Sequence, residues 1–443
     1  MPKKKTALTI EERLQQALVP AEEQPYEVPE NWVWVRLGAI AEIVTGGTPS
    51  KKHPEYYGGN FPFYKPSDLD QGRLTYDASE YLSEEGKKVS RIIPKNSTAV
   101  CCIGSIGKCG YLMCEGTTNQ QINSAIPKIN SLCLYYYLCT ENFVQNLLSM
   151  ASATTIAIVN KSKMESCAFP LPPLSEQQRI VERIEELFAK LDEAKERLQE
   201  VADSFAVRKA AILHKAFTGE LTQQWRCENG VSDESWEEKK FSEVAVIKSN
   251  LVSPFDYLDY PHIAPDSIEK FTGRLLSYRT IREDNVKSPK HLFYKGQILY
   301  SKIRPYLSKA IIADVDGLCS ADMYPIEALC NTKYLLKYML STEFLEQSTT
   351  AGSRSLLPKI NQKELSSISV PLPTLPEQHE IVRLIDDLLA RERKAQQAAE
   401  QALASIDLMK KSILARAFRG ELGTNKASEA SALELLKQVL AEN

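Results

Sequence analysis

The sequence predicts an α+β fold in which two globular mixed α/β domains are joined by two long antiparallel helices. These helices form a coiled-coil spacer, and the whole is a pseudo-two-fold internal repeat. Three observations lead to this prediction. The chain has 443 residues, which is long for one hydrophobic core and typical of two domains. One unit of about 200 residues occurs twice, and each copy ends in a long stretch of heptad-spaced apolar residues.

The repeat is clearest over the long helices. Residues 169–221 align with residues 370–422 without a gap, and 21 of the 53 positions are identical. The motif PLP-x-L-x-EQ begins each copy, and the motif AF-x-GEL ends it. Upstream the similarity is weaker: residues 92–103 align with 292–303, and the Gly-Arg-Leu at 72–74 aligns with the one at 273–275. The whole unit is therefore duplicated, with a divergent globular part and a preserved helix.

Both helices carry an apolar stripe with coiled-coil spacing. The first stripe is interrupted at Arg208, and the second contains the charged Glu392 and several alanines. Because each helix is polar on its opposite face, antiparallel pairing of the two is the simplest way to bury both stripes. The candidate spacer and partner contacts are Ile180, Ile184, Leu187, Leu191, Leu198 and Phe205 in the first copy, and Ile381, Ile385, Leu388, Ile406 and Ile413 in the second.

Both ends of each helix are marked. Thr374 with Glu377, like Ser175 with Gln178, has the spacing of a capping box at a helix start. The glycine of each AF-x-GEL motif stands where a left-handed cap would end the helix. About 40 residues at 1.5 Å each predict rods of roughly 60 Å.

The repeat divides the chain into six segments. We expect an N-terminal lead over 1–30, a first globular domain over 31–168, a first spacer helix over 169–222, a second globular domain over 236–369, a second spacer helix over 370–422 and a helical tail over 423–443. The lead and the tail are short and amphipathic, so they either dock on partner proteins or cap the spacer locally.

The globular domains carry side chains suited to reading nucleic acid. The net charge is −3, but residues 270–309 hold ten basic and two acidic residues, a net charge of +8, interleaved with six aromatics. Lys and Arg neutralise phosphates and Arg pairs with guanine, while amides such as those at 119–123 pair with adenine. The candidate DNA contacts are Lys65, Ser105, Lys108, Asn119, Gln120 and Gln121 in the first domain, and Arg274, Lys302, Arg304, Tyr306 and Lys309 in the second.

The sequence contains no recognisable catalytic or metal-binding motif. The clustered cysteines at 101, 102, 109 and 114 lack the C-x2-C spacing of a zinc site, so we expect buried, reduced thiols. The loop at 104–108, Gly-Ser-Ile-Gly-Lys, lacks the spacing of a P-loop, and no dinucleotide, base-extruding methyltransferase, zinc-protease or serine-hydrolase motif occurs. We therefore expect no catalytic residue, no metal and no cofactor.

Nothing in the sequence indicates a membrane or a secretory route. No apolar run approaches the ~20 residues that span a bilayer, and the lysine-bearing start has no apolar core or cleavage site. We expect a cytoplasmic protein that does not associate with a membrane.

The repeated motifs resemble those of a known family. PLPPLSEQ at 170–177 and PLPTLPEQ at 371–378, each leading into a helix that ends in KAFTGEL (215–221) or RAFRGEL (416–422), are similar to the two conserved regions of the DNA-specificity subunit of Type I restriction–modification enzymes. The resemblance covers essentially the whole chain, and the motif occurs twice at the spacing that this family uses.

The resemblance implies a function and a set of partners. Each globular domain would be a target recognition domain that reads one half of a split, asymmetric site on double-stranded DNA, and the helices would set the gap between half-sites. Two modification subunits that methylate adenine and two restriction subunits that translocate and cleave DNA would bind the chain. The chain itself would be non-catalytic, which agrees with the missing motifs.

Two other interpretations stay open at this point. One is a self-contained methyltransferase or nuclease with degenerate motifs. The other is a coiled-coil scaffold that organises proteins without reading DNA.

Overall fold

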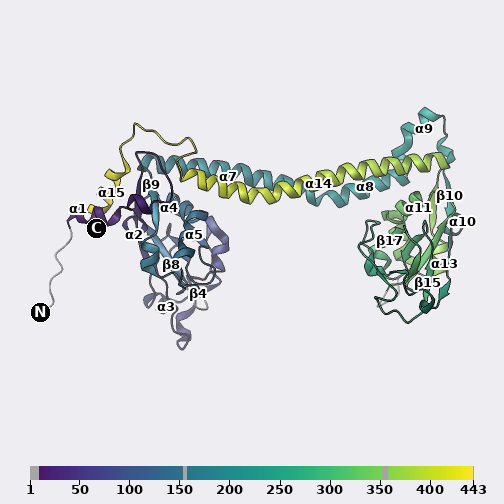
Figure 1. Ribbon diagram of the computed structural model, residues 1–443, viewed down its shortest axis with the longest axis horizontal. Helices are drawn as coiled ribbons and strands as arrows, with labels where there is room; N and C mark the ends of the chain where they lie inside the picture. The colour runs from purple at the N-terminus through teal and green to yellow at the C-terminus, as the bar shows by residue number, and fades with distance from the viewer. Residues whose placement is uncertain (1–8, 153–156, 352–357, 443) are drawn as a thin grey trace. The chain divides into compact units, whose positions relative to one another are not determined.

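The computed structural model describes residues 9–152, 157–351 and 358–442, which form two compact units. The first unit is Met1–Arg197 with Ala402–Asn443, and the second is Leu198–Gln401. The first spacer segment consists of α7 (Leu174–Asp203) and α8 (Phe205–Phe217), and the second is α14 (Leu375–Ala417). Each unit therefore contains the start of one spacer segment and the end of the other (Figure 1).

The first unit is built on small antiparallel sheets. Its main sheet has the strand order β2-β8-β5-β6, a second sheet has the order β4-β3-β7, and β1 pairs with β9. The strands are β1 (Val33–Arg36), β2 (Ala41–Thr45), β3 (Tyr57–Tyr64), β4 (Glu80–Leu82), β5 (Thr98–Cys101), β6 (Cys109–Tyr111), β7 (Thr117–Thr118), β8 (Ile122–Pro127) and β9 (Ala168–Leu171). The helices are α1 (Ile10–Ala17), α2 (Leu37–Ile40), α3 (Glu84–Lys88), α4 (Ser131–Leu138), α5 (Glu141–Met150), α6 (Lys161–Glu165) and α15 (Ala432–Ala441).

The second unit repeats this plan. Its main sheet has the order β11-β19-β16-β17, β10 pairs with β20, and the second sheet is larger, with the order β12-β15-β18-β13-β14. The strands are β10 (Glu237–Lys240), β11 (Ala245–Ile247), β12 (Leu251–Val252), β13 (Pro261–Ile263), β14 (Arg279–Thr280), β15 (Lys290–Phe293), β16 (Ile298–Ser301), β17 (Ala310–Ile312), β18 (Gly317–Cys319), β19 (Met323–Ala328) and β20 (Ser369–Leu372). The helices are α9 (Gln223–Asn229), α10 (Phe241–Val244), α11 (Thr332–Met339), α12 (Thr342–Ala351) and α13 (Gln362–Ser366).

The spacer helices pack against each other in antiparallel fashion within each unit, as the sequence predicts (Figure 1). In the first unit Asp192 of α7 accepts from Lys410 of α14 at 2.5 Å. In the second unit Arg208 of α8 lies 2.5 Å from Glu392 of α14. The two charged residues that interrupt the apolar stripes are thus partners of each other, and α7 gives way to α8 at Ser204, just before Arg208. The Arg208–Glu392 ion pair therefore helps to fix the register of α8 against α14.

The predicted spacer contacts differ in burial along the helices. Ile180, Ile184, Ile381 and Ile385, near the helix starts, are fully buried, and Ile406 is nearly so. The others are half-buried, namely Leu187, Leu191, Leu198, Phe205, Leu388 and Ile413. The helices are therefore held most tightly where they meet the globular domains.

The predicted capping boxes are wrong, whereas the predicted glycine caps are confirmed. Gln178 accepts from the side chain of Asn130 at 3.0 Å and donates to Glu182, and Glu377 turns into the core instead of back toward Thr374. The glycines of both AF-x-GEL motifs have positive φ, 82° and 74°, as a left-handed cap requires. The box spacing misled because the side chains of Gln178 and Glu377 have other partners in the tertiary structure.

In the second unit the glutamate of the PLP-x-L-x-EQ motif, Glu377, forms hydrogen bonds that connect three elements. Glu377 is fully buried, and its Oε1 accepts from Thr222 (2.7 Å), Arg226 (2.8 Å) and the indole of Trp236 (3.1 Å). Thr222 directly follows the AF-x-GEL motif that ends α8. The start of one spacer helix is thereby bonded to the end of the other and to the globular domain.

The first unit contains the same arrangement. Glu176, also fully buried, accepts from the indole of Trp32 (2.7 Å), from Asn425 (2.8 Å) and from Thr424 (3.3 Å). Thr424 follows the AF-x-GEL motif that ends α14. Burying a carboxylate is costly unless it is hydrogen-bonded, and each unit supplies three side-chain donors at this point. In the second unit all three bond Oε1, and Oε2 of Glu377 has no partner among the described residues.

The remaining residues of the two motifs fasten the domain to the helices. Gln177 accepts from the backbone NH of Asn130 at 3.1 Å and so holds the start of α4, and Gln378 does the same for α11 at 3.0 Å. The phenylalanine of AF-x-GEL inserts between aromatic rings of its unit: Phe418 lies 5.2 Å from Tyr137, and Phe217 lies 5.1 Å from Tyr338. The glutamine and the phenylalanine of the two motifs therefore both hold the globular domain against a spacer helix.

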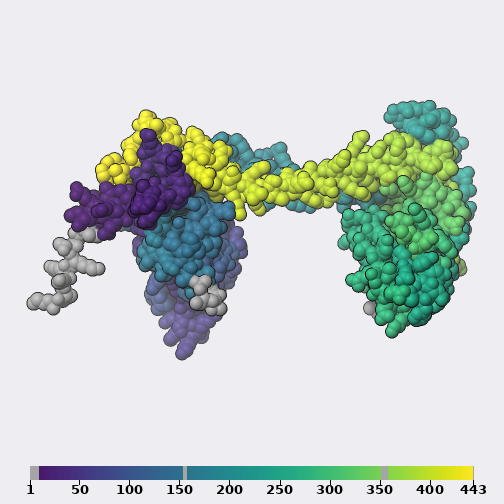
Figure 2. Space-filling model, in the orientation of Figure 1, coloured from purple at the N-terminus to yellow at the C-terminus, as the bar shows by residue number. Residues whose placement is uncertain are grey.

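The two terminal segments pack locally on the first unit. Arg13 of α1 donates to the carbonyl of Leu440 in α15 at 3.1 Å, and Ala432 donates its NH to the carbonyl of Asn31 at 2.9 Å. Both helices contribute to the main core of that unit, and they lie side by side in Figure 2. Arg179 of α7 also forms a bidentate pair with Glu429, just before α15. These contacts fit the expectation of local capping, and docking of the two segments on partner proteins stays a prediction.

The buried carboxylate network makes a prediction about stability. We expect Glu377→Ala to lower the free energy of unfolding of the second unit by about 3–5 kcal/mol, because it leaves Nη1 of the buried Arg226 without its carboxylate partner. The pair between Nε of Arg226 and the exposed Asp233 remains. The measurement is chemical denaturation followed by tryptophan fluorescence. The exposed Glu220→Ala is the matched control, and we expect it to stay within about 0.5 kcal/mol of the parent. A loss below about 1 kcal/mol for Glu377→Ala would contradict the proposed role.

Candidate nucleic-acid interface

The six candidates of the first domain lie together at one edge of its sheets. Ser105 and Lys108 are in the turn between β5 and β6, and the turn at 119–121 follows β7. The residue after β5 donates its NH to the carbonyl of Gln121 at 2.7 Å, so the two turns are adjacent. Lys65 follows the last residue of β3, whose carbonyl accepts from the NH of Asn119 at 3.0 Å. Residues far apart in sequence thus form one polar surface.

Two of these candidates are already paired with acids. Lys65 lies 2.9 Å from Glu80, and Lys108 lies 2.7 Å from Asp70. Asn119 is buried, whereas Ser105 and Gln120 are exposed. The side-chain amides at 119–121 are therefore the main hydrogen-bonding groups of this edge that are not paired with acids.

Four of the five candidates in the second domain lie in the loop between β16 and β17. They are Lys302, Arg304, Tyr306 and Lys309. Arg304 and Tyr306 are exposed, and Arg304 has a positive φ of 49°, with its NH bonded to the carbonyl of Pro358 at 2.7 Å. Arg274 lies in a separate loop, which approaches this one where Phe271 donates its NH to the carbonyl of Ser308 at 3.3 Å. The structure thus brings the five into one region.

The positive charge of residues 270–309 is partly neutralised by acids outside that stretch. Arg274 makes a bidentate pair with Glu269, and Arg282 pairs with Asp259 at 3.0 Å. Lys309 donates to a backbone carbonyl at 2.7 Å and lies 3.8 Å from Asp266. The net charge of this region is therefore smaller than the +8 of the sequence stretch.

Lys302 is surrounded by further basic groups that were not among the sequence candidates. Its ammonium lies 5.1 Å from the ring of Tyr324. Burial lowers the pKa of Lys302, and the nearby charge of Lys359 lowers it further, whereas Asp322 raises it. Burial, followed by the charge of Lys302, lowers the pKa of His291. The signal that would have found this cluster is the alignment of the 119–121 turn with 320–322 at the repeat shift of 201.

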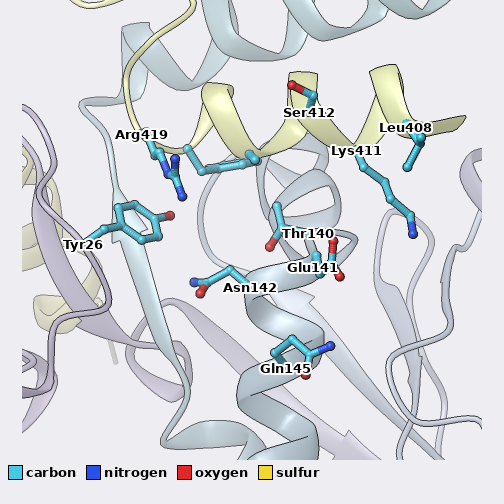
Figure 3. A pocket seen from close by; sticks show the side chains of 11 residues that line it. Tyr26, Thr140, Glu141, Asn142, Gln145, Leu408, Lys411, Ser412 and Arg419 are labelled. Carbon is cyan, nitrogen blue, oxygen red and sulfur yellow. The ribbon is translucent and has the colours of Figure 1, made fainter. Parts of the chain in front are cut away.

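A different surface lies between the spacer and the globular domain of each unit. In the first unit a groove separates the start of α5 from the last turns of α14, with Glu141 and Gln145 on one side and Leu408 and Lys411 on the other (Figure 3). In the second unit the corresponding groove lies between α8 and the start of α12. Lys209 of that groove donates to a backbone carbonyl, and burial lowers its pKa to about 8.

Neither a metal site nor a membrane segment is found among the residues that the structure describes. No three side chains of His, Cys, Asp or Glu are grouped as a metal ion would require. Most of the cysteines are buried, and burial raises the pKa of Cys102 to about 12. In the same described ranges, none of the helices combines the length and the hydrophobicity needed to cross a bilayer.

Comparison with known proteins gives a consistent result. The family model of the Type I restriction modification DNA specificity domain matches twice, at residues 29–203 and 233–401. The Type I restriction enzyme EcoDI specificity subunit of Escherichia coli is 40% identical over 447 residues, which covers 94% of this chain and 96% of that protein.

Two solved structures share the fold. The HsdS subunit of Thermoanaerobacter tengcongensis superimposes with a TM-score of 0.64 and 18% identity, over 90% of this chain and 99% of that one. A chain from a structure that describes complex assembly and conformational transition of the type I R-M system gives a TM-score of 0.65 at 18% identity, over 90% of this chain and all of that one. At this level of identity the likeness concerns the fold.

Proposed function

Because the chain belongs to the family of Type I restriction–modification DNA specificity proteins, we propose that it reads a bipartite, asymmetric site on double-stranded DNA and holds modification and restriction subunits there. It is the non-catalytic specificity subunit that determines the DNA target of such a complex. The observation that carries this conclusion is the double match of the family model, once to each repeat. Two globular domains with one frame and different surface chemistry are suited to reading two different half-sites.

The surfaces of the two domains support a division of the target. The first domain presents amides at its polar edge, and the second presents lysines and an exposed arginine. Amides suit adenine, and lysine or arginine suits guanine. The two half-sites are therefore expected to differ in sequence, and the complete target to be asymmetric.

The main test is to co-express the chain with its modification subunit and to map methylated adenines across a genome. We expect one motif made of two short specific blocks separated by a gap of unspecified bases. Methylation that does not depend on the chain, or a continuous site, would contradict the proposal. Binding of S-adenosylmethionine by the isolated chain would favour a self-contained methyltransferase, and failure of the complex to retard any DNA at low salt would favour a scaffold.

The spacer helices are proposed to set the gap between the half-sites. The two helix–helix ion pairs, Asp192–Lys410 and Arg208–Glu392, bracket a stretch of spacer that runs from 193 to 207 in one segment and from 393 to 409 in the other. Residues inserted in both helices within this stretch leave both ion pairs intact.

A matched insertion tests the spacer. Four residues added after Ala194 and four after Asp407 lengthen both helices by one turn, about 6 Å. With about 3.4 Å per base pair, we expect the preferred gap to widen by about two base pairs, measured by methylation mapping. The insertion after Ala194 alone is the control, and it should destabilise the spacer because the partner helix is not extended. An unchanged gap in the double insertion, with methylation retained, would rule out the spacer role.

Two modification subunits are proposed to dock at the two equivalent grooves between spacer and domain. Val207 and Leu408 occupy the same position in the two copies of the repeat, and they are 71% and 67% exposed. Leu408 lines the groove of the first unit, and Val207 adjoins Ala206, which lines the groove of the second. Large apolar side chains exposed at equivalent positions are expected where two copies of one partner bind.

Docking is tested by placing a charge at each position. We expect Leu408→Asp and Val207→Asp each to reduce the complex from two modification subunits to one, and the double variant to release both. Native mass spectrometry of the co-purified complex gives the stoichiometry. Leu329→Asp, at an apolar residue that is 62% exposed and lies outside the spacer helices, is the matched control. Two retained subunits in the double variant would show that docking occurs elsewhere.

A further inference from the structure

Each domain contains a three-residue turn at the same place in its fold, 119–121 in the first domain and 320–322 in the second. Each turn joins the short strand β7 or β18 to the long strand β8 or β19. The same three backbone hydrogen bonds hold both turns. The first NH donates to the end of β3 or β13 (3.0 and 2.9 Å), the next strand donates back to the first carbonyl (3.1 and 2.9 Å), and the last carbonyl accepts from the residue after β5 or β16 (2.7 and 3.0 Å).

In the first domain this turn presents amides. The side chain of Asn119 donates to Oε1 of Gln121 at 3.0 Å and accepts the NH of Gln121 at 3.1 Å, while Oε1 of Gln120 bonds the hydroxyl of Thr48. The loop that carries Thr48 presses on the turn at Gly46, where a Cβ would lie 2.2 Å from the carbonyl of Asn119. Within the described part of the chain, the Nε2 groups of both glutamines have no hydrogen-bond partner. The side chains of Gln120 and Gln121 are therefore held in place and keep free NH donors.

In the second domain the same turn is surrounded by cationic groups. Asp322, the counterpart of Gln121, pairs with Lys359 at 3.2 Å, and Lys302 donates its backbone NH to the carbonyl of Asp322. His291 is 3% exposed, and its Nδ1 has no partner among the described residues. Lys290 is also buried, with its ammonium on Ser288. A single acid faces several basic groups, so the ammonium of Lys302 is available to an electron-rich ligand.

Two domains that read different bases need turns with the same backbone support and different side chains. A side chain that discriminates between bases must be held in place, and both turns are anchored by strands on two sides. A pair of amides matches the edge of adenine, and an ammonium matches the O6 and N7 acceptors of guanine. We propose that the turns at 119–121 and 320–322 are equivalent parts of two base-reading elements. Gln120 and Gln121 of the first turn read an adenine in one half-site, and Lys302, whose backbone NH bonds the second turn, reads a guanine in the other. This inference rests on the proposed DNA-reading function.

Two conservative substitutions in the full chain, co-expressed with the modification subunit, test the inference by methylation mapping. Gln121→Glu keeps the acceptor for Asn119 and removes the free donors. We expect it to shift the preference at one position of the first half-site from adenine toward cytosine, which donates to carboxylates. Lys302→Met keeps the length and removes the charge. We expect it to lower the discrimination for guanine at one position of the second half-site by about 5- to 150-fold.

Each variant has an internal control, because the half-site read by the other domain should stay unchanged. Lys302→Arg should keep the guanine preference, since Arg also pairs with that edge. Arg304→Ala removes an exposed cation two residues from Lys302, and we expect it to weaken the second half-site without changing its base preference and to leave the first intact.

The outcomes separate this inference from the function on which it rests. If the parent chain produces no two-part motif, the proposed function fails. If the parent motif is present and the variants keep its base preferences, only the assignment of the turns is overturned. Uniformly weaker methylation at every site, with unchanged preferences, would assign Lys302 to phosphate contact and would also overturn the inference. A variant that yields no methylation is compared by competition binding with half-site-substituted DNA, where equal loss for all substitutions contradicts base reading.

Discussion

The architecture depends on one buried carboxylate at the start of each spacer helix. Glu176 and Glu377 each accept hydrogen bonds from a tryptophan of the globular domain and from the threonine that follows the AF-x-GEL motif of the opposite spacer segment. A carboxylate without donors could not remain in that environment, so domain, helix start and helix end must come together or none of them is stable there. The antiparallel arrangement of the spacer is therefore specified at its two ends, and the half-buried middle contributes register through ion pairs.

This constraint explains which parts of the two repeats resemble each other. The glutamate of each PLP-x-L-x-EQ motif bonds the threonine that follows the AF-x-GEL motif of the other copy, so the two segments constrain each other. The glutamines hold the first turn of α4 and α11, and the phenylalanines fill the aromatic core beneath. The polar edges of the globular domains have no such cross-repeat contacts, and their side chains are free to differ. One frame can carry two chemically different surfaces for this reason.

Parts of the fold and of the site follow from local sequence, and other parts do not. Heptad spacing predicted the helices and their pairing, and the motif glycines predicted the helix ends. The capping boxes were predicted wrongly, because Glu377 has a local partner at the right spacing and stronger distant partners in Thr222, Arg226 and Trp236. The charge of residues 270–309 was overestimated, because Glu269, Asp259 and Asp266 fold back onto that stretch.

The sequence by itself determined the duplication, the two long helices and the family, since these depend on period, spacing and short motifs that are contiguous in the chain. Tertiary structure alone decided which residues share a surface. Arg208 and Glu392 are separate irregularities in two stripes, and only the packed helices show that they are partners. The two reading turns are each three residues long and lack a common side chain, so their equivalence is visible only in backbone hydrogen bonds. Sequence patterns reflect interactions between residues that are close together in the chain. A binding surface depends instead on distances between residues that only folding brings together.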